Sequence, residues 1–289
     1  MTSPPAEGEQ PLPVQLSIID GGAETSQAKP PAKQPTDGGP VVRVRMTVAY
    51  DGRGFRGFAA QPGGVRTVAG TLALALARQL RQPVTLVTAG RTDAGVHAWG
   101  QVVSFDAPVD RFDPERLQRS LNRALSPTVV VRAVEAAPPG FDARRSALSR
   151  RYRYTILNRP VPDPFLAPTA WHVPGDVDLA AMRLACDPLL GEHDFTSFCR
   201  PPRKAVQPSM VRNVLDARWS EPDDEILRFE IEASSFCHQM VRSVVGFMVA
   251  VGTGRRRAGE MAGVIGARDR SFAPNLAPAH GLCLWEVRY

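Results

Sequence analysis

Two successive sets of hydrophobic patterns, arranged in the same order, constrain the fold of this chain more than any other feature. Between residues 43 and 136 the patterns predict a strand, a helix, two strands, a helix and a strand. The same order returns between residues 149 and 289, apart from one additional short helix. A β-α-β-β-α-β order is typical of the ferredoxin-like arrangement. We therefore predict an α+β protein with two ferredoxin-like halves.

The expected elements follow from hydrophobic period and from turn residues. The first half spans residues 41–137, with strands expected at 43–50, 84–89, 100–106 and 128–136 and helices at 68–81 and 114–125. The second half spans residues 138–289, with strands at 149–158, 211–219, 225–233 and 282–289 and helices at 176–190, 236–251 and 256–266. Asp176 is the expected N-cap of helix 176–190. We expect two antiparallel sheets joined edge to edge, with the helices on one side and a ligand cleft between the halves.

Residues 1–40 have a different composition from the rest of the chain. They contain eight prolines and no aromatic residue. Such a segment cannot bury enough apolar surface to offset the entropy of ordering it. We expect it to be a disordered tail. It lacks the basic start and apolar run of a signal peptide, and no later stretch is long and apolar enough to predict a membrane span. A cytoplasmic protein without a membrane partner is expected.

The charge of the chain favours an anionic partner. There are 35 basic and 29 acidic residues, which gives a net charge of +6, and 32 of the basic residues are arginines. Arginine suits bidentate recognition of phosphate better than lysine does. The balance permits binding of nucleic acid in a central basic cleft, although arginine usage also reflects genome composition.

The four cysteines, Cys186, Cys199, Cys237 and Cys283, show no metal-binding or redox spacing. We expect four reduced, packed thiols. No cluster of metal-ligating residues and no phosphate-binding or dinucleotide-binding glycine motif is present in the sequence. No metal and no cofactor are therefore predicted.

The loop 89–98, AGRTDAGVHA, lies between two expected strands and holds Arg91, Asp93 and His97 close together. One interpretation is a glycine-rich connection in which Asp93 and Gly95 serve turn geometry. The alternative is a functional loop, because an aspartate held by rigid strands is well placed to act as nucleophile or base.

Arg242 is the only formally charged residue between Glu232 and Arg255, inside a strongly apolar helix. A buried arginine needs an anionic partner. It could extend to the surface or pair with a structural carboxylate. The more specific hypothesis pairs it with a catalytic carboxylate, for which Asp93 is the candidate.

The segment Arg150–Tyr154 alternates basic and aromatic residues. On a strand, Tyr152 and Tyr154 share one face, and Arg151 and Arg153 share the other. This pattern fits a strand with an aromatic core face and a solvated basic face. It also fits an aromatic that stacks on a base beside arginines that hold phosphates.

At these residues the chain resembles the tRNA pseudouridine synthase A (TruA) family. The most distinctive run is AGRTDAGVH (89–97). Other matching segments occur in the family's order: VAYDGRGFRGF (48–58), RTVAGTLALAL (66–76), FDARRSALSRRYRYTILN (141–158), GEHDFTSF (191–198), RNV (212–214), CHQMVRSVVG (237–246) and GLCLWEVRY (281–289). The resemblance covers residues 41–289.

The resemblance implies a role for individual residues. Asp93 matches the family's essential aspartate, and Arg91 the arginine that precedes it. Tyr152 matches the tyrosine that packs against the target base, and Arg242 the basic residue that pairs with the aspartate. Further RNA contacts are expected from three other arginines, Arg144, Arg151 and Arg153. Gly57-Phe58-Ala59 departs from the family's usual Gly-Trp-Gln, which puts RNA contacts from that loop in doubt.

The resemblance also implies a function. The family isomerises uridine to pseudouridine at positions 38, 39 and 40 of the tRNA anticodon arm, without a cofactor, and usually as a homodimer bridged by one tRNA. Asp93 could attack C1′ of the ribose or remove the C2′ proton. A non-catalytic RNA-binding protein of the same fold is the alternative, which would not need the Asp93–Arg242 pair. A glycoside hydrolase would need a second carboxylate about 5–10 Å from the first, and the sequence offers none in comparable context.

Overall fold

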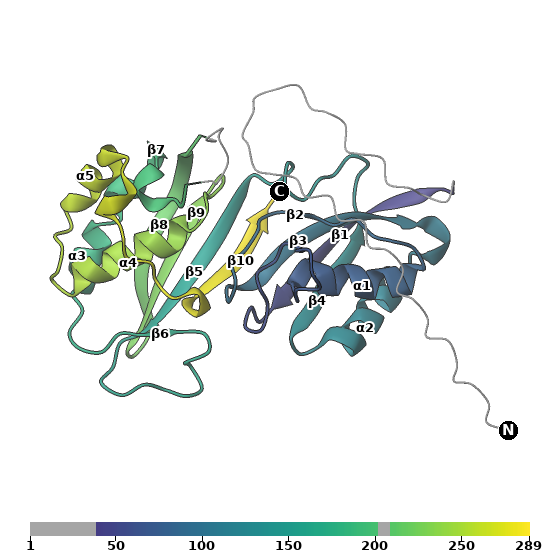
Figure 1. The fold of residues 1–289 in the computed structure, drawn as a ribbon, viewed down its shortest axis with the longest axis horizontal. Coiled ribbons are helices and arrows are strands. Elements are labelled where there is room, and N and C mark those ends of the chain that lie inside the picture. Colours follow the sequence, from purple (N-terminus) through teal and green to yellow (C-terminus); the bar gives the residue numbers. More distant parts are fainter. Residues whose placement is uncertain (1–38, 202–208) are drawn as a thin grey trace.

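The computed structural model describes residues 39–201 and 209–289 and contains one ten-stranded sheet (Figure 1). The N-terminal half contributes β1 (Val41–Tyr50), β2 (Val87–Thr88), β3 (His97–Pro108) and β4 (Val129–Ala136). The C-terminal half contributes β5 (Ser149–Leu157), β6 (Trp171–His172), β7 (Gly191–Asp194), β8 (Val211–Asp223), β9 (Ile226–Ala233) and β10 (Leu282–Arg288). The strand order is β4-β1-β3-β10-β5-β9-β8-β7, with β2 paired to β3 and β6 paired to β5.

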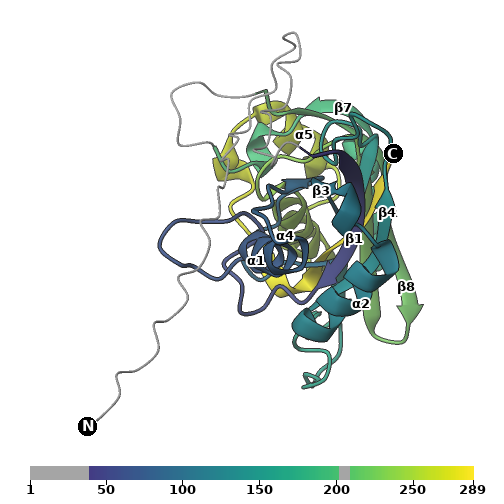
Figure 2. The same ribbon diagram turned by 90° about the vertical axis from the view of Figure 1, so that its right-hand side faces the viewer.

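Five α-helices accompany this sheet in the described residues: α1 (Val68–Leu80), α2 (Pro114–Leu125), α3 (Leu179–Leu184), α4 (Met240–Gly252) and α5 (Glu260–Ala267). Figure 2 shows α1 and α4 on the same side of the sheet. The helix starts follow from local chemistry. The Thr67 side chain accepts a hydrogen bond from the Gly70 N–H at the start of α1, and Asp113 caps α2 ahead of Pro114.

The last strand joins the two halves into one continuous sheet. β10 pairs in parallel with β3, where Cys283 lies opposite His97, and it pairs antiparallel with β5. Gly100 of β3 permits this approach, because a Cβ there would lie 2.4 Å from the Trp285 carbonyl oxygen. The two antiparallel sheets that were expected to join edge to edge thus form one mostly antiparallel sheet, in which the junction between β3 and β10 is parallel. Inserting β10 there satisfies hydrogen bonds on both of its edges.

Several expected elements differ from the structure. The helix expected at 176–190 is only α3 followed by the 3-10 turn Asp187–Leu189, and its N-cap is Asp178 rather than Asp176. Pro188 in that turn cannot donate a helical hydrogen bond, which is consistent with the early end of the helix. The strand expected at 84–89 is reduced to β2. The short strands β6 and β7 were not predicted.

The helix expected at 236–251 begins four residues later, at Met240. Gln239 has a left-handed backbone conformation, with φ of 66°, so the helix cannot extend backward through it. Residues 236–239 form instead a turn that leads into α4. This turn is important below because it lies beside Asp93.

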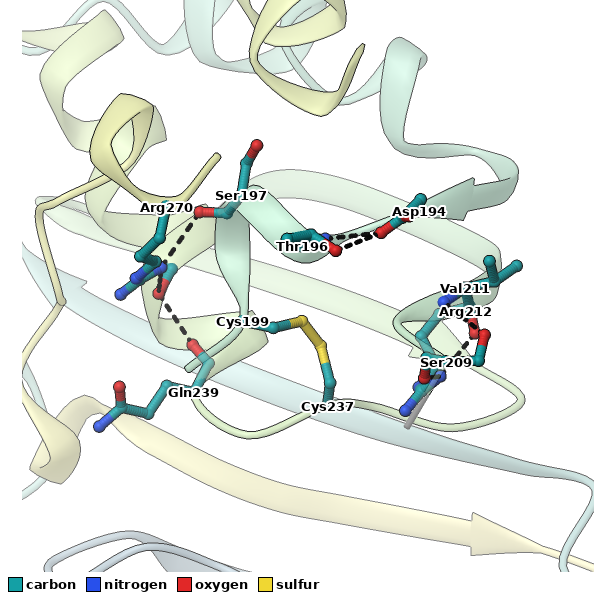
Figure 3. Close-up of a disulfide and its surroundings, with 11 residues drawn as sticks. Asp194, Thr196, Ser197, Cys199, Ser209, Val211, Arg212, Cys237, Gln239 and Arg270 are labelled. Atoms are coloured by element: carbon teal, nitrogen blue, oxygen red, sulfur yellow. Dashed lines mark hydrogen bonds between the residues drawn. A yellow bond between two sulfur atoms is a disulfide. The ribbon is translucent and has the colours of Figure 1, made fainter. Parts of the chain in front are cut away.

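The expectation of four free thiols is wrong for one pair. Cys199 and Cys237 form a disulfide, with their Cα atoms 5.8 Å apart (Figure 3). The two residues are separated by 38 positions in the sequence, so only the packing of the chain brings them together. Cys186 and Cys283 are free.

Other expectations concern termini and membranes. The predicted tail, residues 1–40, lies outside the described residues except for its last two positions. Within residues 39–201 and 209–289, no helix has the length and apolar character that crossing a membrane requires.

Candidate active site

Asp93 lies in the loop between β2 and β3, at the junction of the two halves. The loop begins at Ala89, whose N–H donates to the Val102 carbonyl, and it closes with a hydrogen bond from Val96 N–H to the Asp93 carbonyl at 3.1 Å. The first flank is therefore fixed to β3, and the second ends in a closed turn that runs directly into β3. The Asp93 side chain keeps 25% of its surface exposed. It is thus held firmly by its backbone but remains accessible.

The end of β1 and the turn that follows it support the Asp93 loop through contacts with Thr92. The Phe58 N–H donates to the Thr92 carbonyl at 3.1 Å, and the Tyr50 hydroxyl lies 2.7 Å from the Thr92 hydroxyl. Gly57 has φ of 95°, and a Cβ there would lie 3.0 Å from the Thr92 carbonyl oxygen. Phe58 is 1% exposed. In the segment Gly57-Phe58-Ala59, which departs from the family pattern, the aromatic side chain therefore packs in the core and supports the loop.

His97 fixes the other end of the loop. The Gly52 N–H donates to its Nδ1 at 3.1 Å, and its Nε2 lies 3.2 Å from the Pro168 carbonyl oxygen. Because both ring nitrogens are engaged and the residue is buried, His97 serves to hold the β1 turn against β3.

Arg242 approaches Asp93 from α4, which belongs to the other half of the chain. Its Nη1 lies 3.3 Å from Oδ2 of Asp93, across 149 positions of sequence. Its Nε donates to the Ala277 carbonyl at 2.7 Å, and the Ala277 N–H donates back to the Arg242 carbonyl. The structure thus brings together the two residues that the sequence suggested as a pair.

A second basic side chain contacts the same carboxylate. Nε2 of His238 lies 3.2 Å from Oδ1 of Asp93. Sequence reasoning missed this residue, because histidine is not counted among the formal charges of a sequence and so gave no charge signal. Its position four residues before Arg242 is the only hint that the sequence contained.

The two partners keep Asp93 ionised. Burial alone would raise the pKa of the Asp93 carboxyl, but the hydrogen bond and charge of His238 and the charge of Arg242 outweigh burial and hold this pKa below its ordinary value. At neutral pH the group is therefore a carboxylate. A partly exposed carboxylate with both oxygens oriented can act as a nucleophile or as a base.

Tyr152 lies on the helix-facing side of β5, close to this carboxylate. It is 7% exposed, and its ring packs edge-on against Phe236 with centroids 5.0 Å apart. Its hydroxyl lies 3.8 Å from the position that a Cβ of Gly90 would occupy. Burial and the nearby Tyr50 and Asp93 raise the pKa of Tyr152 far above its ordinary value, so the hydroxyl stays protonated.

The other predicted arginines lie in different places. Arg91 is exposed and belongs to the same loop as Asp93, and Arg144 is exposed on the segment before β5. Arg151 and Arg153 project from the opposite face of β5 to Tyr152, where they form ion pairs with Glu232 and Glu230. The structure therefore does not bring Arg151 and Arg153 to the Asp93 site.

Arg150 begins the basic and aromatic segment that the sequence indicated, but sequence reasoning assigned no role to it. It is 8% exposed and donates five hydrogen bonds to four backbone carbonyls. The acceptors lie on the Asp93 loop, on the segment before β5 and on the segment that leads to α4: Ala89, Arg144, Ala147 and Ser234. One guanidinium therefore connects three segments that surround the site.

Replacing Arg150 is expected to destabilise the protein. Arg150→Met would leave four carbonyls without this donor, and the loss of even two buried hydrogen bonds costs about 2 kcal/mol or more in free energy of unfolding. Thermal or denaturant unfolding measures this loss. Arg145→Met is the matched control, because Arg145 is exposed and its substitution should change stability by less than about 0.5 kcal/mol. Equal stabilities of the two variants would contradict the role assigned to Arg150.

The described residues contain no group of three or more His, Cys, Asp or Glu side chains placed to hold a metal ion.

Comparison with known proteins adds to this geometry. The family model for tRNA pseudouridine synthase matches residues 46–144 and 185–289. Among solved structures, the archaeal box H/ACA sRNP Nop10–Cbf5 complex aligns with a TM-score of 0.32 and 13% identity, covering 72% of this chain and 43% of that one.

Curated relatives match over most of the chain. The tRNA pseudouridine synthase A of Frankia casuarinae is 45% identical over 258 residues, which are 88% of this chain and 91% of the relative. The tRNA pseudouridine synthase A of Bacillus subtilis is 38% identical and that of Corynebacterium glutamicum 41%; each match covers 86% of this chain, and 99% and 89% of the relatives.

Proposed function

Because this chain belongs to the tRNA pseudouridine synthase family, we propose that it isomerises uridines 38, 39 and 40 of the tRNA anticodon arm with Asp93 as the catalytic carboxylate. Conversion of uridine to pseudouridine in tRNA follows from the family. The choice of these three positions and the role of Asp93 are our proposal. A non-catalytic RNA-binding protein would have no use for an ionised, accessible carboxylate at the centre of the site.

The reaction explains why one carboxylate is enough. The N1–C1′ glycosidic bond breaks, the uracil turns, and a C5–C1′ bond forms. C5 loses its proton and N1 gains one, so the composition and the redox state are unchanged. No cofactor is required by this balance. Asp93 either attacks C1′ to form a covalent intermediate or removes the C2′ proton to give a glycal, and both routes need it ionised.

The observation that carries the proposal is the environment of Asp93. Its carboxylate keeps 25% exposure, and each of its oxygens faces one basic side chain. These contacts favour the ionised form without covering the group. An ionised carboxylate that a target ribose can reach is what either route requires.

Tyr152 and the exposed arginines supply the remaining roles. We assign to Tyr152 the stacking contact with the flipped uracil, supported by its position beside Asp93 and its fixed ring. Arg91 and Arg144 are exposed, and we assign them to phosphate contacts. An RNA contact of Arg151 and Arg153 would have to occur on the opposite face of the sheet.

The larger organisation is proposed on the same basis. The strand orders β4-β1-β3-β2 and β10-β5-β9-β8 support two ferredoxin-like halves, with the first half ending near residue 137 and a basic cleft between them. We propose a cytoplasmic location, which the tRNA substrate supports. We also propose a homodimer, supported by Trp99, which is 46% exposed and stacks on Trp285. A solution mass of two chains supports the dimer, and a single-chain mass at working concentration contradicts it.

Mapping the modified positions tests the proposed specificity. Unmodified tRNA carrying uridines in the anticodon arm is incubated with the protein, and pseudouridine is located by carbodiimide adducts that stop primer extension. We expect stops at 38, 39 and 40 wherever these are uridines. Stops confined to another arm of the tRNA would contradict the specificity but not the isomerisation, whereas no stop anywhere would contradict both.

A further inference from the structure

The turn 236–239 supplies more of the site than its sequence suggests. Phe236 packs against Tyr152, His238 contacts Asp93 and the turn leads directly to Arg242. Seven consecutive residues, 236–242, therefore make one contact with Tyr152 and two with Asp93. The position of this short turn therefore sets where Phe236 and His238 lie relative to Tyr152 and Asp93.

His238 and Arg242 contact different oxygens of the Asp93 carboxylate. His238 faces Oδ1 at 3.2 Å, whereas Arg242 faces Oδ2 at 3.3 Å. Donors on opposite oxygens fix the rotation of the carboxylate about its Cβ–Cγ bond. With Arg242 alone, the carboxylate could turn and present either oxygen to the ribose. A reacting group held in one orientation lowers the barrier of the chemical step.

The His238 side chain needs support from its backbone. It is 51% exposed, and ion pairs at exposed sites contribute about 0–1 kcal/mol because water screens them. Such a contact persists only where the imidazole is already placed correctly. The backbone of the turn must therefore be held from elsewhere.

Two tethers join the turn to the segment that follows β7. The Cys199–Cys237 disulfide is next to His238 on one side (Figure 3). The Arg200 N–H donates to the His238 carbonyl at 2.9 Å. The segment that contains Cys199 anchors the turn and is itself well fixed. Cys199 is 2% exposed and follows Phe198, which is fully buried. The Ser197 carbonyl and the Ser243 hydroxyl both accept hydrogen bonds from Arg270, which connects this segment to α4.

We propose that His238 is a positioning residue of the Asp93 carboxylate and that the Cys199–Cys237 disulfide holds it there. This inference rests on the proposed function of Asp93. His238 acts through Asp93 and not on the substrate. The ionisable groups that bear on Asp93 are His238 from the turn, Arg242 from α4 and Tyr152 from β5.

The disulfide makes this placement sensitive to reductants. An external dithiol transfers two electrons and two protons to the Cys199–Cys237 bond, which becomes two thiols, while the dithiol becomes a cyclic disulfide. Cys237 is partly exposed, which gives the reductant access. After reduction the turn keeps the Arg200–His238 hydrogen bond to its anchor but has lost its covalent bond to it. The imidazole then spends less time beside Asp93, and turnover slows.

Two substitutions of His238 test its role. We expect His238→Phe to lower the single-turnover rate of pseudouridine formation about tenfold while tRNA affinity stays within about twofold. His238→Gln retains a side-chain N–H donor and should recover most of the rate. His172→Gln is the matched control, because Nε2 of that imidazole lies 2.8 Å from the Arg159 carbonyl oxygen and not beside Asp93.

The pH profile distinguishes this role from a purely structural one. Because His238 helps to hold the pKa of Asp93 low, its removal raises that pKa, and less of Asp93 is ionised at a given acidic pH. The acid limb of the single-turnover profile should therefore move to higher pH in His238→Phe. A rate and profile equal to those of the wild type would overturn the inference. Failure of the wild type itself to form pseudouridine would instead overturn the proposed function.

The effect of the disulfide is tested in the wild type and in His238→Phe. Thiol alkylation followed by mass measurement of the intact protein establishes the redox state of each sample. We expect the dithiol-reduced wild type and the Cys199→Ser, Cys237→Ser double variant to be slower than the oxidised wild type by a similar few-fold factor. In His238→Phe, reduction should change nothing further. An equal rate of oxidised and reduced wild type, or an equal slowing of His238→Phe by reduction, would overturn the part assigned to the disulfide.

Discussion

Asp93→Asn is expected to abolish pseudouridine formation, by at least about a thousandfold, while tRNA affinity stays within about threefold. The amide has almost the same size as the carboxylate and can still face Arg242 and His238. It has no negative charge, so it can neither attack C1′ nor remove the C2′ proton. Primer-extension mapping of pseudouridine measures the turnover, and filter retention of labelled tRNA measures the affinity.

Asp110→Asn is the matched control for this substitution. Asp110 is 75% exposed in the 3-10 turn Val109–Arg111, where it forms an ion pair with its neighbour Arg111. Its change should leave both turnover and affinity unaltered. A large loss of tRNA affinity in Asp93→Asn, rather than of turnover, would show that Asp93 binds the RNA and is not the reacting group.

Arg242→Met is expected to lower turnover by about a hundredfold at neutral pH, a loss of about 2.7 kcal/mol in transition-state stabilisation. The methionine preserves much of the volume in α4 but leaves Oδ2 of Asp93 and the Ala277 carbonyl without their donor. The carboxylate then loses one of its two orienting contacts. Single-turnover rates with saturating tRNA measure the effect on the chemical step.

The pH dependence of Arg242→Met identifies the cause. Arg242 holds the pKa of Asp93 below its ordinary value together with His238, so its removal raises that pKa. The acid limb of the rate should therefore move to higher pH, and part of the activity should return as the pH increases. Arg255→Met, an exposed arginine just beyond the end of the same helix, is the control. Normal turnover by Arg242→Met would contradict the pairing.

The sequence predicted the long elements well, because a helix of several turns or a strand of many residues repeats its hydrophobic pattern several times. β1 and α1 begin and end within two residues of their expected limits, because alternation and a helical period are local signals that their burial then satisfies. Short strands lack such a signal. β6 has two residues and is defined only by its pairing with β5, so no window of sequence could reveal it.

The sequence predicted the site residues whose formal charge contrasts with an apolar stretch of sequence around them. Arg242 stands out in an apolar helix and Asp93 in a loop between apolar strands, and the structure places them 3.3 Å apart. His238 is not counted among the formal charges of the sequence, and its contact depends on the left-handed turn at Gln239, which propensity alone does not predict for a glutamine. The Cys199–Cys237 bond likewise depends on packing between segments 38 positions apart.

Release of tritium from tRNA labelled at C5 of its uracils tests the central claim most directly, because C5 loses its hydrogen only when it bonds to C1′. Wild type and Asp93→Asn are compared at equal occupancy by tRNA. We expect stoichiometric release from the target uridines by the wild type and none by Asp93→Asn. Release by both proteins would show that Asp93 is not the catalytic carboxylate, and release by neither, despite bound tRNA, would contradict isomerisation of this substrate.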